Sequence, residues 1–403
     1  MATPEEVNVW IGLDVGKEEH YATVLDDHGD KLAARSLTND ETDIEALVDV
    51  GEKHGKPALV IDQPGSIARL TLAVAQRRGV PVAYVPGLVM RRAADLYPGE
   101  AKTDPIDSYV LADTARTRRK QVQWLDVTDK VLEQLQILNG FDIDLAADVT
   151  RVASRLRDAL TSISPALERA IGSRLSHGGI RALLAKYPTP AALRKAGKTR
   201  VAKLMKARSP RLANKVADAV FTALDAQTVT VPAEATIGRI IAELAVELDR
   251  LHERRETLAK EIEEVFLAHP LGPVLVSLPG IGTRTGARIL AEIGDGSRFS
   301  SGAKLASYAG LAPVLRQSGS SLKSVSRSRR GNHRLKNALF LAAFAAIRTG
   351  ESKAFYDRKR AEGKRHNAAV ICLARRRCDV ILAMLRNGEC YVDSNGVEID
   401  EAA

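Results

Sequence analysis

The stretch Ala101-Lys102-Thr103-Asp104-Pro105-Ile106-Asp107-Ser108 organises the interpretation of this 403-residue chain. Asp104 and Asp107 are three residues apart where a helix is expected to begin, so their side chains share one face, with Cβ atoms roughly 5–6 Å apart. That spacing suits a shared divalent cation. The same residues also make a good helix start, with Asp104 as N-cap, Pro105 at the first helical position and Asp107 near the positive end of the helix dipole.

Two further carboxylates end predicted strands earlier in the chain. An apolar strand at residues 7–14 stops on Asp14, and another at residues 57–62 stops on Asp62. Hairpin and periodicity signals add strands at 20–25, 31–37 and 80–85, and helices at 41–54, 65–78 and 105–116. This order of elements is the plan of the ribonuclease-H-like fold, in which the first strand lies centrally beside the fourth. Asp14 and Asp62 are therefore expected to be neighbours.

The last of these helices, packed across the sheet, would bring Asp104 and Asp107 alongside Asp14 and Asp62. Four carboxylates in one place repel one another, and each tends to be protonated unless a cation neutralises them. Two Mg²⁺ ions about 3.5–4 Å apart resolve this and hold the attacking and leaving oxygens of a phosphodiester. A single acid at a strand end is usually a turn residue, so the prediction depends on the conjunction of all four.

Positive charge is concentrated toward the C-terminus. The whole chain has a net charge of +9, whereas residues 316–390 contain 18 Lys or Arg and 5 Asp or Glu. Such polarity indicates that a polyanion is bound at that end, and nucleic acid is the commonest one.

Composition also bears on the compartment. Cys372, Cys378 and Cys390 are too few and too badly spaced for a disulfide framework or a four-ligand zinc site, which indicates a reducing interior. The N-terminus is acidic where a signal peptide is basic, and no apolar run approaches about 18 residues. A cytoplasmic protein without a membrane span is expected.

Two long helical patterns frame residues 119–270. The second is typical of a coiled coil over about four heptads, with Arg255 taking the one missing apolar place. The first is similar but is interrupted by Asp142. They pair either as an antiparallel hairpin or with copies in another subunit, and a contribution from a partner subunit is favoured. Between them, residues 173–227 are helical and basic. A solvated helix face and a contact with nucleic acid both explain this charge.

Two motifs stand out in residues 271–392. The turn with Gly280 and Gly282 predicts a helix-hairpin-helix, whose backbone N–H groups bind phosphate without reading bases, although an ordinary tight connection is the alternative. The loop that begins with Ser318 is followed in sequence by many Lys and Arg residues, whose positive charge favours an oxyanion forming on phosphorus. Ser318 is therefore a candidate nucleophile, with a basic binding loop as the alternative. The candidate nucleic-acid contacts are Arg316, Lys323, Arg327, Arg329, Arg330, Arg334, Lys336, Gly280 and Gly282.

The next helix, at residues 334–348, is expected to be part of the core. Its apolar residues are Leu335, Leu339, Phe340, Ala343, Phe344 and Ile347.

Six motifs occur in a fixed order along the chain. They are Gly12-Leu-Asp14-Val-Gly-Lys17, Val60-Ile-Asp62, Lys102-Thr-Asp104-Pro-Ile-Asp107, Leu278-Pro-Gly-Ile-Gly282, Tyr308-Ala-Gly-Leu-Ala-Pro313 and Arg316-Gln-Ser318-Gly-Ser-Ser321. Together they resemble the DEDD transposases of the insertion sequence one-ten family. The resemblance implies a RuvC-like catalytic domain at 1–118, a helical and coiled-coil region at 119–270, a mainly helical C-terminal transposase domain at 271–392 and an acidic tail at 393–403.

Carried onto these positions, the resemblance makes Asp14, Asp62, Asp104 and Asp107 the Mg²⁺-binding tetrad. Ser318 becomes the residue that joins covalently to a cleaved DNA strand. The second carboxylate of the family pattern is commonly Glu, and here it is Asp62, one methylene shorter. The resemblance further implies a structured bridge RNA that pairs with donor and target DNA.

The resemblance also implies an active site shared between subunits. The carboxylates of one subunit meet the serine loop of another in a tetramer built from dimers, so Ser318 is expected to lie far from Asp104 within one chain. The expected fold class is α/β plus α, and the expected function is that of an RNA-guided DNA transposase. The alternatives are a metal-dependent RuvC-like junction nuclease, which needs the acids but not Ser318, and a non-catalytic nucleic-acid-binding regulator.

Overall fold

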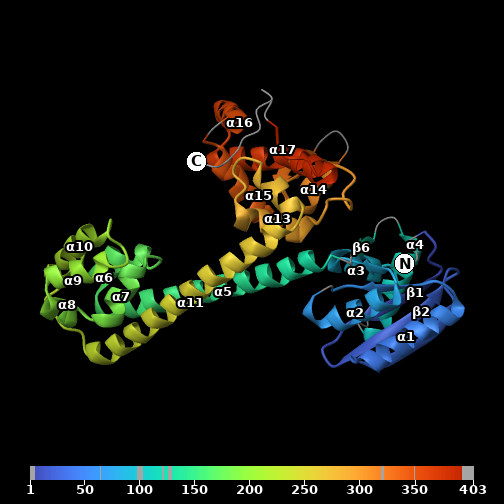
Figure 1. Ribbon diagram of the computed structural model, residues 1–403, viewed down its shortest axis with the longest axis horizontal. Coiled ribbons are helices and arrows are strands. Elements are labelled where there is room, and N and C mark those ends of the chain that lie inside the picture. Colours follow the sequence, from blue (N-terminus) through green and yellow to red (C-terminus); the bar gives the residue numbers. More distant parts are fainter. Residues whose placement is uncertain are drawn as a thin grey trace. The chain divides into compact units, whose positions relative to one another are not determined.

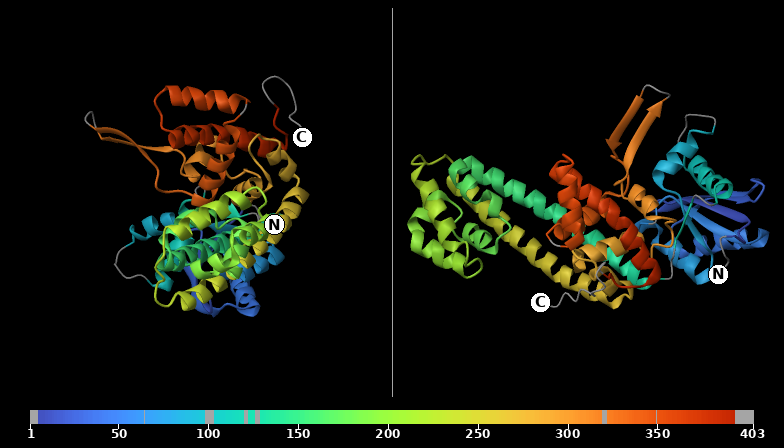
Figure 2. Two further views of the ribbon diagram at one scale, coloured as in Figure 1. Left: turned by 90° about the vertical axis from the view of Figure 1, so that its left-hand side faces the viewer. Right: turned by 90° about the horizontal axis from the view of Figure 1, so that it is seen from above.

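The computed structural model describes residues 5–63, 65–97, 103–119, 122–125, 129–318, 322–348 and 350–392. The chain divides into two compact units. One is Met1–Glu133 with Gly296–Ser300, and the other is Gln134–Asp295 with Ser301–Ala403. Figures 1 and 2 show the elements of each unit.

The first unit contains a six-stranded mixed sheet of order β3-β2-β1-β4-β5-β6. Central strand β1 pairs antiparallel with β2 and parallel with β4, which confirms the predicted place of the first strand beside the fourth. Antiparallel edge strand β6, which pairs with β5, is not among the predicted strands. The strands are β1 (Val9–Asp14), β2 (Glu19–Asp26), β3 (Lys31–Thr38), β4 (Pro57–Ile61), β5 (Val82–Tyr84) and β6 (Gln123–Leu125).

Helices cover both faces of this sheet (Figure 1). Because successive side chains of a strand point to opposite faces, β1 contributes to two separate cores. Ile11 and Leu13 pack with helices α1 and α2, whereas Trp10 packs with α3 and α4. The helices are α1 (Glu41–His54), α2 (Arg69–Arg78, after the short 3-10 turn Ser66–Ala68), α3 (Gly87–Ala94) and α4 (Asp104–Thr117).

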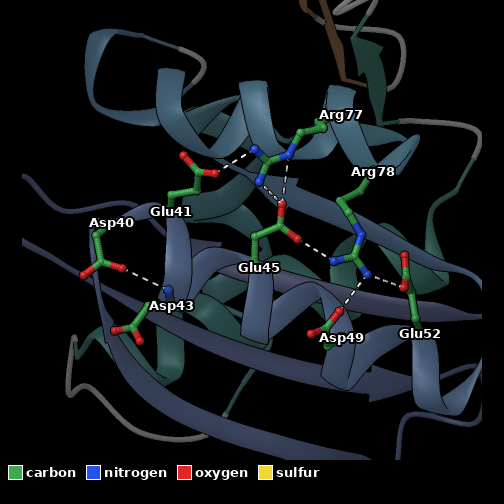
Figure 3. Close-up of polar contacts among 8 residues, drawn as sticks. All are labelled: Asp40, Glu41, Asp43, Glu45, Asp49, Glu52, Arg77 and Arg78. Atoms are coloured by element: carbon green, nitrogen blue, oxygen red, sulfur yellow. Dashed lines mark hydrogen bonds and ion pairs between the residues drawn. The ribbon is translucent and has the colours of Figure 1, made fainter.

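Ion pairs tie α1 to α2 (Figure 3). Arg78 contacts Asp49 at 2.7 Å and Glu52 at 2.5 Å, and both Arg77 and Arg78 contact Glu45. The hydrogen bond from Arg77 leads the effects that hold the pKa of Glu45 below its usual range. Solvent-facing pairs of this kind contribute at most about 1 kcal/mol each. These carboxylates are paired with arginines, so the cluster joins the two helices.

The second unit is helical apart from one two-stranded ribbon. Helices α5 (Lys130–Ile163) and α11 (Glu234–Ala268) lie side by side in opposite directions (Figures 1 and 2). The sequence allowed a hairpin and favoured a contribution from a partner subunit; within the one chain that the structure contains, the two helices form an antiparallel pair. Between them come α6 (Pro165–Ile171), the 3-10 turn Gly172–Arg174, α7 (Gly178–Lys186), α8 (Pro190–Ala196), α9 (Lys198–Lys206) and α10 (Ala213–Asp225).

The two interruptions of the heptad patterns pair with each other. Arg255 donates to both carboxylate oxygens of Asp142, at 2.8 and 3.1 Å, and Arg288 donates to Oδ2 at 2.6 Å. Asp142 is only 6 % exposed. Burial raises the pKa of Asp142, but the hydrogen bonds and charges of the two arginines outweigh burial and hold that pKa below its usual value. This cluster joins α5, α11 and α13.

We expect Asp142→Ala to lower the free energy of unfolding by about 3 kcal/mol at neutral pH, because two largely buried arginines lose their counter-charge. Because the folded pKa is depressed, the carboxylate contributes fully above its unfolded pKa of about 3.9, and this contribution is lost as pH falls through the folded pKa. Urea unfolding of wild type and variant at neutral and strongly acidic pH measures both effects.

Asp148→Ala is the matched control for this substitution. Asp148 also lies on α5 and pairs with Arg151, but that pair is exposed, so its loss is expected to cost less than about 1 kcal/mol. Equal losses in the two variants would contradict the role assigned to Asp142.

The rest of the second unit packs helices around α17. Gly280, in the turn between α12 and α13, has a φ of +85°, and a Cβ there would lie 2.5 Å from the carbonyl oxygen of Ala342. No helix in the described ranges is long and apolar enough to cross a membrane. The elements are α12 (Leu271–Val276), α13 (Thr283–Ile293), α14 (Gly302–Tyr308), β7 (Pro313–Ser318), β8 (Leu322–Arg327), α15 (His333–Ala346), α16 (Gly350–Ala361) and α17 (His366–Asn387).

Helix α15 follows its predicted burial in part, with Phe340 and the following Ile347 only half-buried. Leu335, Leu339 and Ala343 are buried, as the periodicity predicts. The placement of Phe344 in the core is wrong, because its side chain is 41 % exposed. It shares the solvent-facing side of the helix with Leu341, which is equally exposed.

Candidate active site

Asp14 and Asp62 start from neighbouring strands. Leu13 of β1 pairs with Ile61 of β4, and the next residues in sequence are Asp14 and Asp62, respectively. Adjacent strands lie about 4.8 Å apart, and side chains two residues apart point to the same face. Asp14 therefore projects on the same face as Trp10, and both carboxylates are half-buried. This is the face that α4 covers.

Helix α4 crosses this face directly over β1. A Cβ added to Gly12 would lie 2.0 Å from the carbonyl oxygen of Ser108 and 2.6 Å from the backbone nitrogen of Ala112, so only glycine allows this approach. Thr23, which pairs with Gly12 from β2, shares a hydrogen bond of 2.7 Å with the hydroxyl of buried Ser108. The middle of α4 is thus fixed at Gly12, two residues before Asp14.

The far end of α4 fixes its direction. Arg116 donates to the carbonyl oxygen of Asp27 at 3.2 Å, next to the end of β2 where Asp26 pairs with Val9. The C-terminal end of α4 therefore lies at the start of β1, and its first turn points toward the end of β1. Asp104 and Asp107 are in that first turn. The structure brings them to the same edge of the sheet as Asp14 and Asp62.

The helix start differs from the capping arrangement that the sequence also allowed. Helix α4 begins at Asp104 itself, the N-cap position is Thr103, and the N-cap side chain makes no capping hydrogen bond. Asp104 is exposed and Asp107 is half-buried. The assignment of Asp104 as N-cap is wrong, and its carboxylate is not used to cap the helix.

A buried histidine shapes the turn that follows Asp14. The backbone N–H of Gly16 donates to Nδ1 of His20 at 3.1 Å. Burial is the main cause that lowers the pKa of His20, and hydrogen bonds from its surroundings oppose it. Sequence reasoning missed His20, Thr23 and Ser108 as positioning residues. Only the polar character of these residues within apolar segments could have indicated them.

The donor chemistry of the four carboxylates suits a divalent cation. Oxygen ligands are those that Mg²⁺ prefers, and the positive end of the α4 dipole tempers their mutual repulsion. Among the residues that the structure describes, no three His, Cys, Asp or Glu side chains are arranged closely enough to hold a metal ion. The four residues therefore fit the ion by the chemistry of their donor atoms, whereas their side chains as described are not gathered into a metal site.

Ser318 lies at the end of a strand. It is the last residue of β7 and pairs with Leu322 of β8, which places its backbone at the tip of an antiparallel ribbon. The loop 319–321 lies outside the described residues, as do the side chains of 315–318, 322–325 and 327, including those of Arg316, Lys323 and Arg327. The sequence predicted the loop but not the two strands beside it.

The remaining candidate nucleic-acid residues differ in their surroundings. Arg329, Arg330 and Arg334 are exposed. Lys336 is half-buried, and its ammonium donates to the carbonyl oxygens of Gly310, at 2.9 Å, and Ser328, at 3.3 Å. These two contacts give Lys336 a role in holding the segment after β8.

The two glycines of the predicted hairpin also differ. Gly280 packs against α15, so its lack of a side chain serves the fold. Gly282 is the exposed N-cap residue of α13 and has open space around it.

Two sequence families match the chain. One, DEDD_Tnp_IS110, is described as "Transposase" and matches residues 11–165. The other is described as "Transposase IS116/IS110/IS902 family" and matches residues 272–357. The first match contains all four aspartates, and the second contains Ser318.

Individual proteins are similar over all or part of the chain. The chain is 46 % identical to the 43.6 kDa protein of insertion element IS110 from Streptomyces coelicolor, and the match covers 100 % of both chains. It is 39 % identical to the 42 kDa protein of insertion element IS900 from Mycobacterium paratuberculosis, over 95 % of this chain and 97 % of that protein. The pilin gene-inverting protein of Moraxella bovis is 38 % identical over 29 % of this chain and 38 % of its own length.

Proposed function

This chain belongs to the IS110 family of insertion-sequence transposases, and from that premise we propose that it cuts and rejoins DNA with Mg²⁺, a serine nucleophile and a bridge RNA. The observation that supports the proposal is that Asp14 and Asp62 follow neighbouring strands and that the first turn of α4, with Asp104 and Asp107, points toward the same edge of the sheet. Transposase activity on DNA is the property of the family. The metal, the nucleophile and the guide are the parts that we propose.

The four aspartates would hold the metal. When bound there, Mg²⁺ polarises the phosphodiester and stabilises the attacking and leaving oxygens. The rigid sheet positions Asp14 and Asp62, while Gly12 and Ser108 position the helix that carries Asp104 and Asp107. Asp62 is shorter than the glutamate common in the family, so α4 must bring its own carboxylates close to the strand ends.

Ser318 would make the covalent bond. Its hydroxyl oxygen attacks phosphorus and loses its proton, the bond from phosphorus to one DNA strand breaks, and that strand leaves with a free hydroxyl. A hydroxyl of another strand then attacks the serine phosphodiester and releases Ser318. Exposed Arg329 and Arg330, close by in sequence, support the proposal because positive charge favours the phosphate and the oxyanion formed on it.

The resemblance of the serine loop supports a composite site, with carboxylates from one subunit and Ser318 from another, in a tetramer built from dimers. The same proposal divides the chain into three parts: a RuvC-like domain at 1–118, a coiled-coil region at 119–270 and a transposase domain at 271–392. The basic segments at 173–227 and in the last domain supply charge for DNA and RNA.

A structured guide RNA is expected to copurify with the protein. Sequence choice would then reside in base pairing, which explains why the chain contains no base-reading motif. Sequencing the bound RNA is expected to give one discrete species, encoded beside the gene for this chain. An unrelated protein of similar isoelectric point, near 9.4, is the control for charge alone. Recovery of the same mixture of cellular RNA from both proteins would contradict the guide.

A further inference from the structure

Three aromatic side chains from three different helices meet on the surface of the second unit. The ring of Phe344 on α15 lies 5.8 Å from that of His366 on α17, and His366 lies 5.7 Å from the ring of Tyr356 on α16. The Tyr356 hydroxyl is 2.7 Å from Nδ1 of His366. Phe344 and His366 are both exposed, so this cluster presents ring surface to solvent.

Helix α16 and the start of α17 contain more Lys and Arg residues than Asp and Glu residues. On α16, the ring of Phe355 has Arg358 at 5.1 Å, Lys359 at 5.6 Å and Arg376 at 5.2 Å. Cations gathered around one ring repel one another, and this repulsion favours a bound anion.

Carboxylates neutralise only part of this charge. Lys359 pairs with Glu362 at 2.8 Å, and Glu351 approaches Arg376 at 3.9 Å. Among the described residues, no carboxylate lies within ion-pair distance of Arg358, Arg360 or Arg365. A polyanion would therefore find cations on this surface that no acid among the described residues already pairs with.

We propose that Phe344, Tyr356 and His366, with the cations of α16 and the start of α17, form a stacking platform for single-stranded DNA. Every base has a flat face that stacks on an aromatic ring, while the neighbouring phosphates contact Lys and Arg side chains. Duplex DNA does not offer its base faces, so the exposed rings favour an unpaired strand. The inference rests on the proposed function for the choice of DNA, since cutting and exchanging strands produces unpaired DNA.

A protein partner fits this surface less well. Aromatic residues and Arg also occur at protein interfaces, but the interiors of those interfaces are depleted of charged residues as a class. Here α16 and the start of α17 carry an excess of cations, and Arg360 and Arg365 are exposed close to these rings in sequence. On α15 itself, exposed apolar surface beside Phe344 comes from Leu341. The combination of rings and unneutralised cations is the composition of a single-strand binding surface.

Fluorescence anisotropy tests the platform without any chemistry, using full-length protein in EDTA. The probes are a labelled single-stranded oligodeoxynucleotide, its duplex and the oligoribonucleotide of the same sequence, all at one salt concentration. We expect Phe344→Leu combined with His366→Leu to weaken single-strand DNA binding about tenfold or more and duplex binding less than about twofold. Phe344→Trp, which keeps a stacking ring, is expected to retain affinity and is a second test if the leucine variant does not fold.

Phe141→Leu is the matched control. Phe141 is 44 % exposed and has Arg254 over its ring at 5.5 Å, but it lies on α5, away in sequence from the basic helices. Its substitution is expected to leave single-strand affinity unchanged. Equal losses for single strand and duplex, an equal loss in Phe141→Leu, or a preference for RNA above about tenfold would each overturn the platform.

The failure of this inference is distinguishable from failure of the proposed function. If wild type binds neither single-stranded nor duplex DNA, both proposals fall. If duplex binding is normal and the Phe344 and His366 variant binds single strands as well as wild type does, only the platform is wrong.

Discussion

Asp104→Asn is expected to reduce Mg²⁺-dependent strand cleavage by about a thousandfold while leaving DNA binding intact. Asparagine keeps the size of the side chain and removes the charge, so α4 still packs over Gly12 and the helix start is preserved. The loss falls on stabilisation of charge in the transition state, where removal of a single well-placed group costs about 10²–10³-fold. Gel assays of cleaved and rejoined DNA measure the rate, and anisotropy in EDTA measures binding.

Asp49→Asn is the matched control for Asp104→Asn. Asp49 is an exposed carboxylate of the same unit, on α1 at the opposite face of the sheet, where it pairs with Arg78. Its loss is expected to change the rate less than about twofold and stability by less than about 1 kcal/mol. Full activity in Asp104→Asn would remove Asp104 from the site. An equal loss in both variants would show a general effect of charge.

The adjacency of Asp14 and Asp62 could be predicted from the sequence because strand order carries geometric information. Residues that end parallel neighbouring strands share an edge, so Asp14 and Asp62 followed from the order of elements alone. The same order predicted a helix packed across the sheet, but the residues that fix α4 on β1 could not be predicted, because the contact depends on a backbone approach at Gly12 and on the hydrogen bond between Thr23 and Ser108. Such contacts join residues that are distant in sequence and have no periodic signal.

Two other features show the same limit. The sequence showed Asp142 and Arg255 as separate interruptions of two apolar patterns, and only the antiparallel pairing of α5 and α11 places them opposite each other. Phe344 follows the apolar period of α15 and was predicted to be buried, yet the side of the helix that it occupies is open to solvent. Periodicity identifies an apolar stripe but not its width, so a residue at the edge of the stripe can be misassigned.

Ser318→Ala is expected to abolish rejoining and the covalent protein–DNA adduct, with a loss of at least about 10⁴-fold, because alanine has no oxygen to bond to phosphorus. Denaturing gels detect the adduct as labelled DNA that migrates with the protein. Ser321→Ala, in the same loop sequence, is the control and is expected to retain the adduct. DNA binding is expected to be unchanged in both variants.

The two active-site substitutions together separate the candidate functions. Loss of activity in both Asp104→Asn and Ser318→Ala supports the recombinase. Loss in Asp104→Asn alone supports a junction nuclease that uses metal-activated water. Tight DNA binding with no cleavage even by wild type, in the presence of its guide RNA, supports a regulator.

Mixing the two inactive variants tests whether subunits share the site. In a shared site, the intact carboxylates of Ser318→Ala subunits meet the intact serine of Asp104→Asn subunits, so the mixture regains part of the wild-type activity. If each subunit completes its own site, every site in the mixture keeps one defect and activity stays at the level of the separate variants. Recovery would depend on both proteins being present in one assembly, because neither provides a complete set of reacting groups alone. Absence of recovery, in mixtures shown by differently tagged subunits to contain both variants, would place the aspartates and Ser318 of one chain in the same site.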